Sequence, residues 1–160
     1  LDVKHASIKP SRKKGWESYQ QKQYNASTKE YDLVTKYKKV HYNEFFGTNS
    51  VSLTVEYKLI STETGEILKT NLISETLEDE VWYITYDANT KNLLSGSWSN
   101  KLINSDTDVI NTSYQDRRQI QNLLKANRKL ISTEELKNTA LKNVSGQAVN
   151  EINAYNPEED

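Results

Sequence analysis

The sequence predicts an α+β fold, in which an antiparallel meander sheet of about four strands carries two C-terminal helices packed on one face. Apolar and polar residues alternate over residues 51–59, the period of a strand with one buried face. Residues 81–86 (VWYITY) are aromatic or β-branched, which suits a pleated surface. Between residues 136 and 152, apolar side chains recur every four positions, the spacing of an amphipathic helix.

The centre of the predicted meander is a hairpin. Residues 63–66 (ETGE) interrupt the alternation, and Gly65 can adopt the positive φ of a hairpin turn at little cost. Residues 67–73 then resume the strand pattern. An acidic run (Glu78, Asp79 and Glu80) is expected to form the loop before the next strand, residues 81–86.

The remaining short elements follow from turn-forming residues and brief alternation. Residues 38–43 predict a strand that ends in a turn at residues 47–50 (GTNS). Residues 87–92 predict a second turn, and residues 93–98 a last short strand or a covering loop. At the N-terminus we expect a short strand (1–9), a basic turn (10–15), and a short helix or irregular loop (16–28).

Two helices are predicted near the C-terminus. Ser113 predicts the start of a helix that continues to Leu130, and Ser132 opens an S-x-x-E capping box before the second helix. The second helix needs an apolar partner, and the apolar face of residues 51–59 is the expected one. Gly146 lies inside this helix, where we expect it to pack closely against the sheet.

Composition narrows the classes of function. With 160 residues, 35% hydrophobic residues and a mean hydropathy of −0.83, the chain suits one domain with a thin, aromatic-rich core. The absence of cysteine excludes disulfides, thiol catalysis and cysteine-based zinc sites. A net charge of −1 produces no electrostatic field that would attract nucleic acid, so nucleic acid is not a predicted partner.

Charge is unevenly distributed along the chain. We predict a basic, partly irregular N-terminal segment at residues 1–36, an α+β domain at residues 37–155, and an acidic tail at residues 156–160. The basic run at residues 12–14 (RKK) has the composition of an anionic-surface binder, with a solvated surface as the default expectation. No apolar run is long enough to span a membrane, and we expect Leu1 to be a processed or engineered start.

Neither metal, cofactor nor catalytic residues are predicted. His5 and His41 lack a second histidine or cysteine at ligand spacing, so we expect surface or edge-strand histidines. Asn104, Asp106 and Asp108 alternate like the opening of a calcium loop. However, the positions that need Gly and Glu hold Val109 and Gln115, so at most a weak calcium site is expected.

Aromatic side chains are the predicted ligand-binding residues. Trp82, Tyr86 and Trp98 could form a stacking platform for a glycan or peptide. Alternation places Trp82 and Tyr86 on one face of their strand, so packing into the core is the competing expectation. The Glu78–Glu80 carboxylates offer a further hypothesis, an enzyme of glycoside-hydrolase type, if two of them flanked a cleft.

One resemblance to a known family rests on the hairpin. Residues 57–68 (YKLISTETGEIL) resemble the strand–turn–strand of CsgG-like (curli-assembly-type) bacterial envelope lipoproteins, and the helix at residues 136–155 is similar to the closing helix of such domains. The resemblance covers residues 37–155. It implies a non-enzymatic envelope domain with an assembly or scaffolding role, and it carries over no functional residue.

The predicted function is therefore that of a non-enzymatic, lipoprotein-type domain of the bacterial cell envelope, in the periplasm or attached to the outer membrane. It would act through protein–protein contacts, with other envelope proteins or by self-association. Membrane attachment would come only from a lipid anchor outside this chain. The alternative is a glycan- or peptide-binding module that uses exposed aromatic residues of the sheet.

Overall fold

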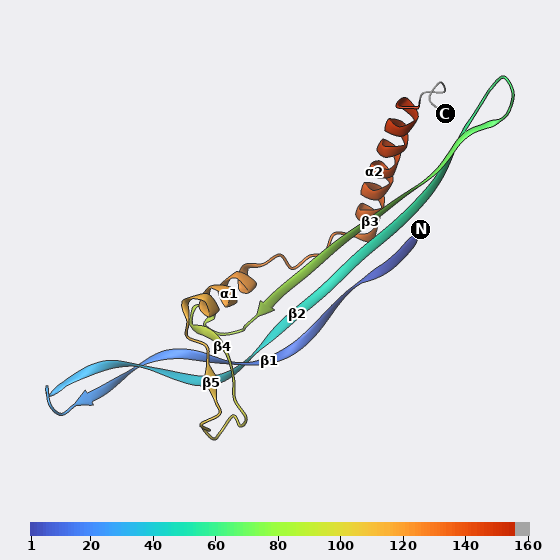
Figure 1. Cartoon of the computed structure of the whole chain (residues 1–160). Coiled ribbons are helices and arrows are strands. Elements are labelled where there is room, and N and C mark those ends of the chain that lie inside the picture. Colours follow the sequence, from blue (N-terminus) through green and yellow to red (C-terminus); the bar gives the residue numbers. More distant parts are fainter. Residues whose placement is uncertain (156–160) are drawn as a thin grey trace. The chain divides into compact units, whose positions relative to one another are not determined.

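A computed structural model describes residues 1–155, with every side chain except that of His5. It confirms an antiparallel sheet followed by two C-terminal helices (Figure 1). The sheet has five strands rather than about four, in the spatial order β3-β2-β1-β4-β5. The strands are β1 (Asp2–Asn25), β2 (Glu30–Ile60), β3 (Ile67–Thr85), β4 (Leu93–Ser97) and β5 (Val109–Ile110).

The first three strands are much longer than the sequence predicted. They hold 24, 31 and 19 residues, whereas strands of roughly 3–10 residues are usual. Four predicted irregular segments are therefore wrong: the turns at residues 10–15 and 47–50, the helix or loop at 16–28 and the acidic loop at 78–80. Apart from residues 26–28, which form a turn, all of them lie within strands. The N-terminal segment is likewise regular, since residues 2–25 form β1.

Two residues explain why turn-like sequences stay extended. Pro10 lies in the part of β1 that β4 does not reach, since β4 pairs only with residues 15–17, and proline is tolerated at such an edge. Asn49 is fully buried in β2, where its side-chain amide donates to the carbonyl of Ile131 at 2.7 Å. This bond and the alternating burial of residues 47–50, in which Gly47 and Asn49 are buried and Thr48 is exposed, favour a strand over an exposed turn.

The predicted hairpin turn after β2 is confirmed. Gly65 has φ = +76°, and the backbone N–H of Ser61 donates to the carbonyl of Glu66 at 2.9 Å. The turn between β1 and β2 was not predicted. There the side chain of Asn25 accepts from the backbone N–H groups of Ser27 and Thr28, and Lys29 adopts a positive φ of 57°.

The chain divides into two compact units, which are described separately below. Unit 1 comprises Leu1–Ser7, Gly47–Glu80 and the described part of Lys129–Asp160. Unit 2 comprises Ile8–Phe46 and Val81–Arg128. The acidic tail predicted at residues 156–160 lies outside the described residues.

The core of unit 1 lies between β2, β3 and α2 (Thr133–Asn153). Ala140 and Val144 of α2 pack against Leu53 of β2 and Ile73 of β3, so the partner surface predicted for this helix is confirmed. Ser132 caps the helix by accepting from the backbone N–H of Glu135 at 3.2 Å, as predicted.

The expectation for Gly146 is wrong. This residue faces solvent, and a Cβ placed on it would meet nothing within 4 Å. The apolar stripe of α2 explains the result, because its buried positions are Leu136, Ala140 and Val144, and Gly146 lies off that stripe.

The core of unit 2 lies beneath α1 (Tyr114–Lys125). Ile120 packs against Tyr42, Ile84 and Leu93, and Ser113 caps the helix as predicted. The helix ends at Lys125 and does not reach Leu130, because the backbone becomes extended at Ala126. A 3₁₀ turn, η1 (Thr90–Asn92), confirms the turn predicted before β4, and β4 is the predicted last short strand.

Neither helix of the described chain is long and apolar enough to cross a membrane.

Candidate functional site

The most distinctive feature of unit 2 is a two-stranded hairpin, residues 18–37, which we call the arm. It consists of the end of β1, the turn at residues 26–29 and the start of β2 (Figure 1). β4 pairs with β1 only at Gly15, Trp16 and Glu17. Among the described residues, β1 therefore has β2 as its only strand neighbour along the arm.

Two tryptophans anchor the base of the arm. The indole N–H of Trp16 donates to the carbonyl of Val109 in β5 at 2.9 Å, and the indole N–H of Trp98 donates to the carbonyl of Gly15 in β1 at 3.0 Å. Both rings are buried, at 5% and 6% exposure. A Cβ on Gly15 would lie 2.8 Å from the carbonyl oxygen of Leu94, so glycine is required for this close approach.

A buried lysine closes the loop between β4 and β5. The ammonium of Lys39, in β2, donates to the carbonyls of Asn100 and Ile103, each at 2.7 Å, and forms an ion pair with Asp108 at 2.6 Å. The side chains of Lys39 and Asp108 are 4% and 8% exposed. The hydrogen bond from Lys39 lowers the pKa of Asp108, and backbone bonds from Ser105 and Ser99 act in the same direction.

A second buried carboxylate lies beside this anchor. Glu17 accepts a short hydrogen bond from the hydroxyl of Tyr86 and pairs with Lys38 at 3.0 Å. Burial alone would raise the pKa of Glu17, but the bonds from Tyr86 and Lys38 outweigh it and the pKa lies below its ordinary value. Burial and the same bond raise the pKa of Tyr86 well above the usual range of a phenol.

A groove of about 500 Å³ runs along the base of the arm. Aromatic and polar side chains line it, including Trp16, Tyr19 and Tyr37 from the two strands and Asn104 and Asp108 from the loop. The Trp16 ring is a buried wall of the groove, and Lys39 lies 5.5 Å from that ring. The aromatic surface that a ligand in this groove could contact is therefore that of Tyr19 and Tyr37.

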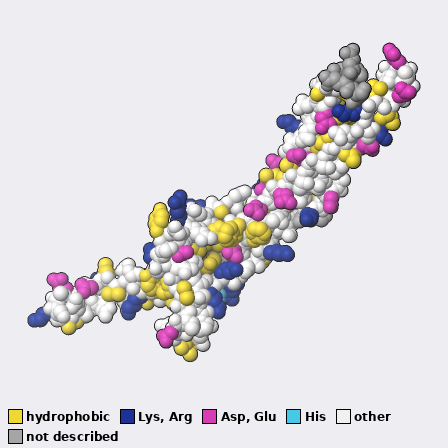
Figure 2. Space-filling view, viewed as in Figure 1, with side chains coloured by type: hydrophobic (Ala, Val, Ile, Leu, Met, Phe, Trp, Pro, Cys, Tyr) yellow, Lys and Arg dark blue, Asp and Glu magenta, His cyan; other side chains and the backbone are white. Residues whose placement is uncertain are grey.

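The arm itself carries large apolar side chains in solvent. Tyr24 and Tyr31 contact each other edge to face, with ring centroids 5.4 Å apart. Leu33 shares the strand face of Tyr31 because the two residues are separated by two positions. The exposed fractions of Tyr24, Tyr31 and Leu33 are 54%, 69% and 68%. Figure 2 shows such hydrophobic side chains at intervals along the arm.

The aromatic residues predicted to bind a ligand are not brought together as one platform. Trp98 is buried at the base of the arm, and the hydroxyl of Tyr86 is engaged by Glu17. Only Trp82 presents its ring to solvent, at 45% exposure. Its neighbour Tyr83 stacks on Phe45 in β2, with ring centroids 4.8 Å apart. In an antiparallel pair this register places Trp82 opposite Phe46, which is 49% exposed.

The acidic run belongs to unit 1, where one of its three carboxylates binds the backbone ahead of α2. The carboxylate of Asp79 accepts from the backbone N–H of Ile131 at 2.7 Å. Glu78 and Glu80 lie on either side of Asp79 in β3, and the run lines a depression of about 290 Å³ together with Asn49. As neighbours in a strand, Asp79 and the two glutamates face opposite sides of the sheet.

The described residues contain no group of three histidine or carboxylate side chains placed to hold a metal ion. Of Asn104, Asp106 and Asp108, which alternate like the opening of a calcium loop, Asp108 forms an ion pair with Lys39. His41 packs on Trp98 and contacts Arg12. The side chain of His5 lies outside the described part of the chain.

Sequence reasoning missed the arm and the buried lysine. One partial signal was available for the arm, because Tyr31, Leu33 and Tyr37 fall on one strand face, although Val34 and Thr35 interrupt the alternation of apolar and polar residues. No local signal marks Lys39, since its neighbours Lys36 and Lys38 are exposed.

Comparison with protein-family models, with curated protein sequences and with solved structures finds no match to this chain.

Proposed function

We propose that this chain is a non-catalytic assembly module that associates with further copies of itself through the arm. The observation that carries this proposal is the two-stranded arm with exposed Tyr24, Tyr31 and Leu33. An isolated two-stranded hairpin is marginally stable in water, and its unpaired edges are templates for another strand. A partner strand would supply backbone hydrogen bonds and would cover the apolar face.

Charge favours a second copy as the partner. The β1 half of the arm, residues 18–25, has Lys22 as its single charged residue, whereas the β2 half, residues 30–37, carries Glu30 and Asp32 near the turn and Lys36 near the base. If the β1 edge of one copy pairs with the β2 edge of the next in a register that sets Lys22 against the two carboxylates, opposite charges meet and Lys22 stays away from Lys36. Such head-to-tail pairing would use different edges of the two copies, which leads to rings or filaments rather than to a two-fold dimer.

The role as an assembly module agrees with the resemblance of residues 57–68 to CsgG-like envelope lipoproteins. We accordingly propose the bacterial cell envelope as its location. Fractionation of cells that express the full-length gene would test this, and recovery of the protein solely in the cytoplasm would contradict it.

Sedimentation velocity over a wide concentration range tests the self-association. We expect the wild-type chain to form dimers and larger species, and Leu33→Asp to weaken association at least tenfold because it places a charge in the paired face. Leu72→Asp is the matched control. Leu72 is 64% exposed on β3 in unit 1, outside the arm, so its substitution should leave association unchanged. A wild-type chain that stays monomeric at millimolar concentration would overturn the proposal.

Trp82 and Phe46 support a second candidate, the binding of a glycan or another extended ligand by stacking. Both rings are half exposed, and the register places them opposite each other. Trp16 and Trp98 are buried, so quenching by a soluble quencher reports mainly on Trp82. Protection of Trp82 by a member of an oligosaccharide panel would support this candidate, and Trp82→Ala should abolish the response. No protection by any member would dismiss it.

A further inference from the structure

The basic residues on one face of unit 2 are not neutralised. Arg12 and Lys14 alternate with Lys13 in β1, so they share one face of the strand and Lys13 lies on the other. Lys13 pairs with Glu44 at 3.2 Å. In contrast, Arg12, Lys14 and Lys101 form no salt bridge within residues 1–155.

These cations converge on His41. The guanidinium of Arg12 lies 3.3 Å from Nδ1 of His41. Because arginine only donates, Nδ1 is the acceptor and the imidazole is neutral in this arrangement. Burial, followed by the positive charges of Arg12, Lys101 and Lys14, lowers the pKa of His41. All the charged groups that affect the pKa of His41 are therefore cations.

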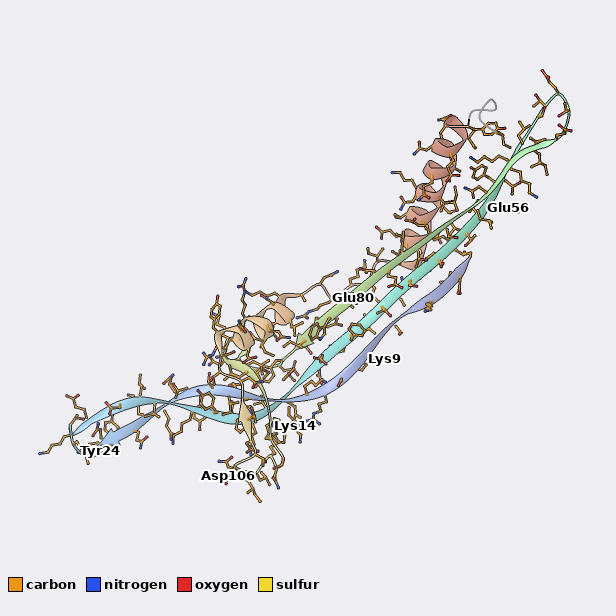
Figure 3. All side chains as sticks on the ribbon, in the orientation of Figure 1. Lys9, Lys14, Tyr24, Glu56, Glu80 and Asp106 are labelled. Atoms are coloured by element: carbon orange, nitrogen blue, oxygen red, sulfur yellow. The ribbon has the colours of Figure 1, made fainter. Side chains whose placement is uncertain are left out.

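A rigid floor holds the cluster in place. The His41 ring contacts the Trp98 ring edge to face, with centroids 4.9 Å apart. The Lys14 ammonium donates to the carbonyl of Trp98 at 2.7 Å and lies 4.7 Å from the centroid of its ring. Figure 3 shows Lys14 on β1 beside the loop that carries Asp106. One ammonium proton is used by the carbonyl, which leaves two donors for a ligand.

From this geometry we infer a binding site for a phosphate-type oxyanion, formed by Arg12, Lys14, His41 and Lys101 above the Trp98 ring. Arginine offers a planar fork of donors that matches an oxyanion, and lysine adds a point charge. Neighbouring like charges repel each other, and a bound dianion would remove that repulsion. The anion would also favour the protonated imidazole, so that His41 changes from acceptor to donor.

Affinity should therefore depend on pH. The free site keeps His41 neutral, and binding raises its pKa, so the phosphate dianion should bind more tightly as the pH falls through the pKa of the bound state toward that of the free state. The charged groups acting on His41 are Arg12 and Lys14 from β1 and Lys101 from the loop before β5.

Titration of the full chain with inorganic phosphate, followed by the imidazole NMR signals of His41, tests the site. Ionic strength is held constant with chloride. We expect saturable shifts, a raised His41 pKa, and affinities reduced about 10- to 100-fold in Arg12→Gln and Lys14→Gln, because each variant loses a charge-assisted hydrogen bond. Lys13→Gln is the matched control, since it changes the same net charge on the opposite face, and it should bind as the wild type does.

Vesicles that contain phosphatidic acid distinguish a lipid headgroup from free phosphate. A response to inorganic phosphate alone assigns the site to a soluble ligand, and a response to vesicles that Arg12→Gln abolishes assigns it to a headgroup. The inference is overturned if neither ligand shifts His41 beyond the chloride control, or if Lys13→Gln weakens binding as much as Lys14→Gln. Circular dichroism of each variant verifies that the sheet is retained.

Discussion

Replacing the buried Lys39 with methionine should destabilise unit 2 by about 3 kcal/mol. The substitution keeps most of the aliphatic stem but removes an ammonium that satisfies two backbone carbonyls and one carboxylate. A buried polar group that loses its partner costs roughly 1–3 kcal/mol, and three partners are affected, with water able to reach some of them. The total lies at the lower end of the roughly 3–5 kcal/mol found when one member of a buried ion pair is removed.

Urea unfolding followed by tryptophan emission measures this change. For an m-value of about 1–3 kcal/mol per molar urea, a loss of about 3 kcal/mol lowers the midpoint of the urea transition by about 1–3 M. Lys36→Met is the matched control. Its side chain is exposed in the same strand and forms no salt bridge within residues 1–155, so its midpoint should move little.

The double variant Lys39→Met, Asp108→Asn separates the cost of an unpaired charge from the cost of lost packing, because asparagine keeps an oxygen that can accept from the backbone N–H of Ser99 or Ser105. Removing both members of a buried pair is often tolerated better than removing one, so we expect the double variant to be more stable than Lys39→Met alone. A loss below about 1 kcal/mol for Lys39→Met would refute the assignment of Lys39 as the closing contact of the loop. Equal instability of the double and single variants would refute the charge argument.

Three further predictions concern stability. Gly146→Ala should raise it by about 0.5–1 kcal/mol in urea unfolding, because the site is an exposed helix interior with room for a Cβ; a loss would show that α2 is packed there. Gly96→Ala should lower it by more than about 2 kcal/mol, since φ is +157° and a Cβ would overlap the Val109 carbonyl oxygen; wild-type stability would contradict this. The folded-state pKa of Glu17 is depressed, so its contribution is complete above the unfolded value of about 4.3 and is lost as the pH falls through the folded value. The gap in melting temperature between wild type and Glu17→Gln should therefore close in acid, and a gap that stays constant from pH 7 to pH 3 would be evidence against it.

The sequence predicted correctly those features that depend on short-range interactions. The Gly65 turn, the Ser113 and Ser132 caps and the packing of α2 on the face that contains Leu53 each depend on residues a few positions apart or on a period. For these features the sequence was a sufficient guide to the structure.

The errors occurred where distant residues decide the outcome. Gly47 and its polar neighbours have the composition of a turn, yet they lie in β2, where Asn49 is buried and bonds to Ile131, which lies 82 residues later. Lysine is almost never buried without a partner, so Lys39 resembled a surface residue until its partners in the distant loop were known. The cluster around His41 was missed for the same reason, because Lys101 comes from the loop between β4 and β5, far from His41 in the sequence.

The contacts that complete unit 2 also set the order in which it can fold. Trp16 bonds to Val109 across 93 residues, and Trp98 bonds to Gly15 across 83. Contacts this far apart in the chain close slowly. During synthesis the ribosome must release the segment up to β5 before the base of the arm can form. The arm therefore emerges well before the strands that anchor it, and nascent chains are the species in which its apolar face most needs a chaperone or a neighbouring copy.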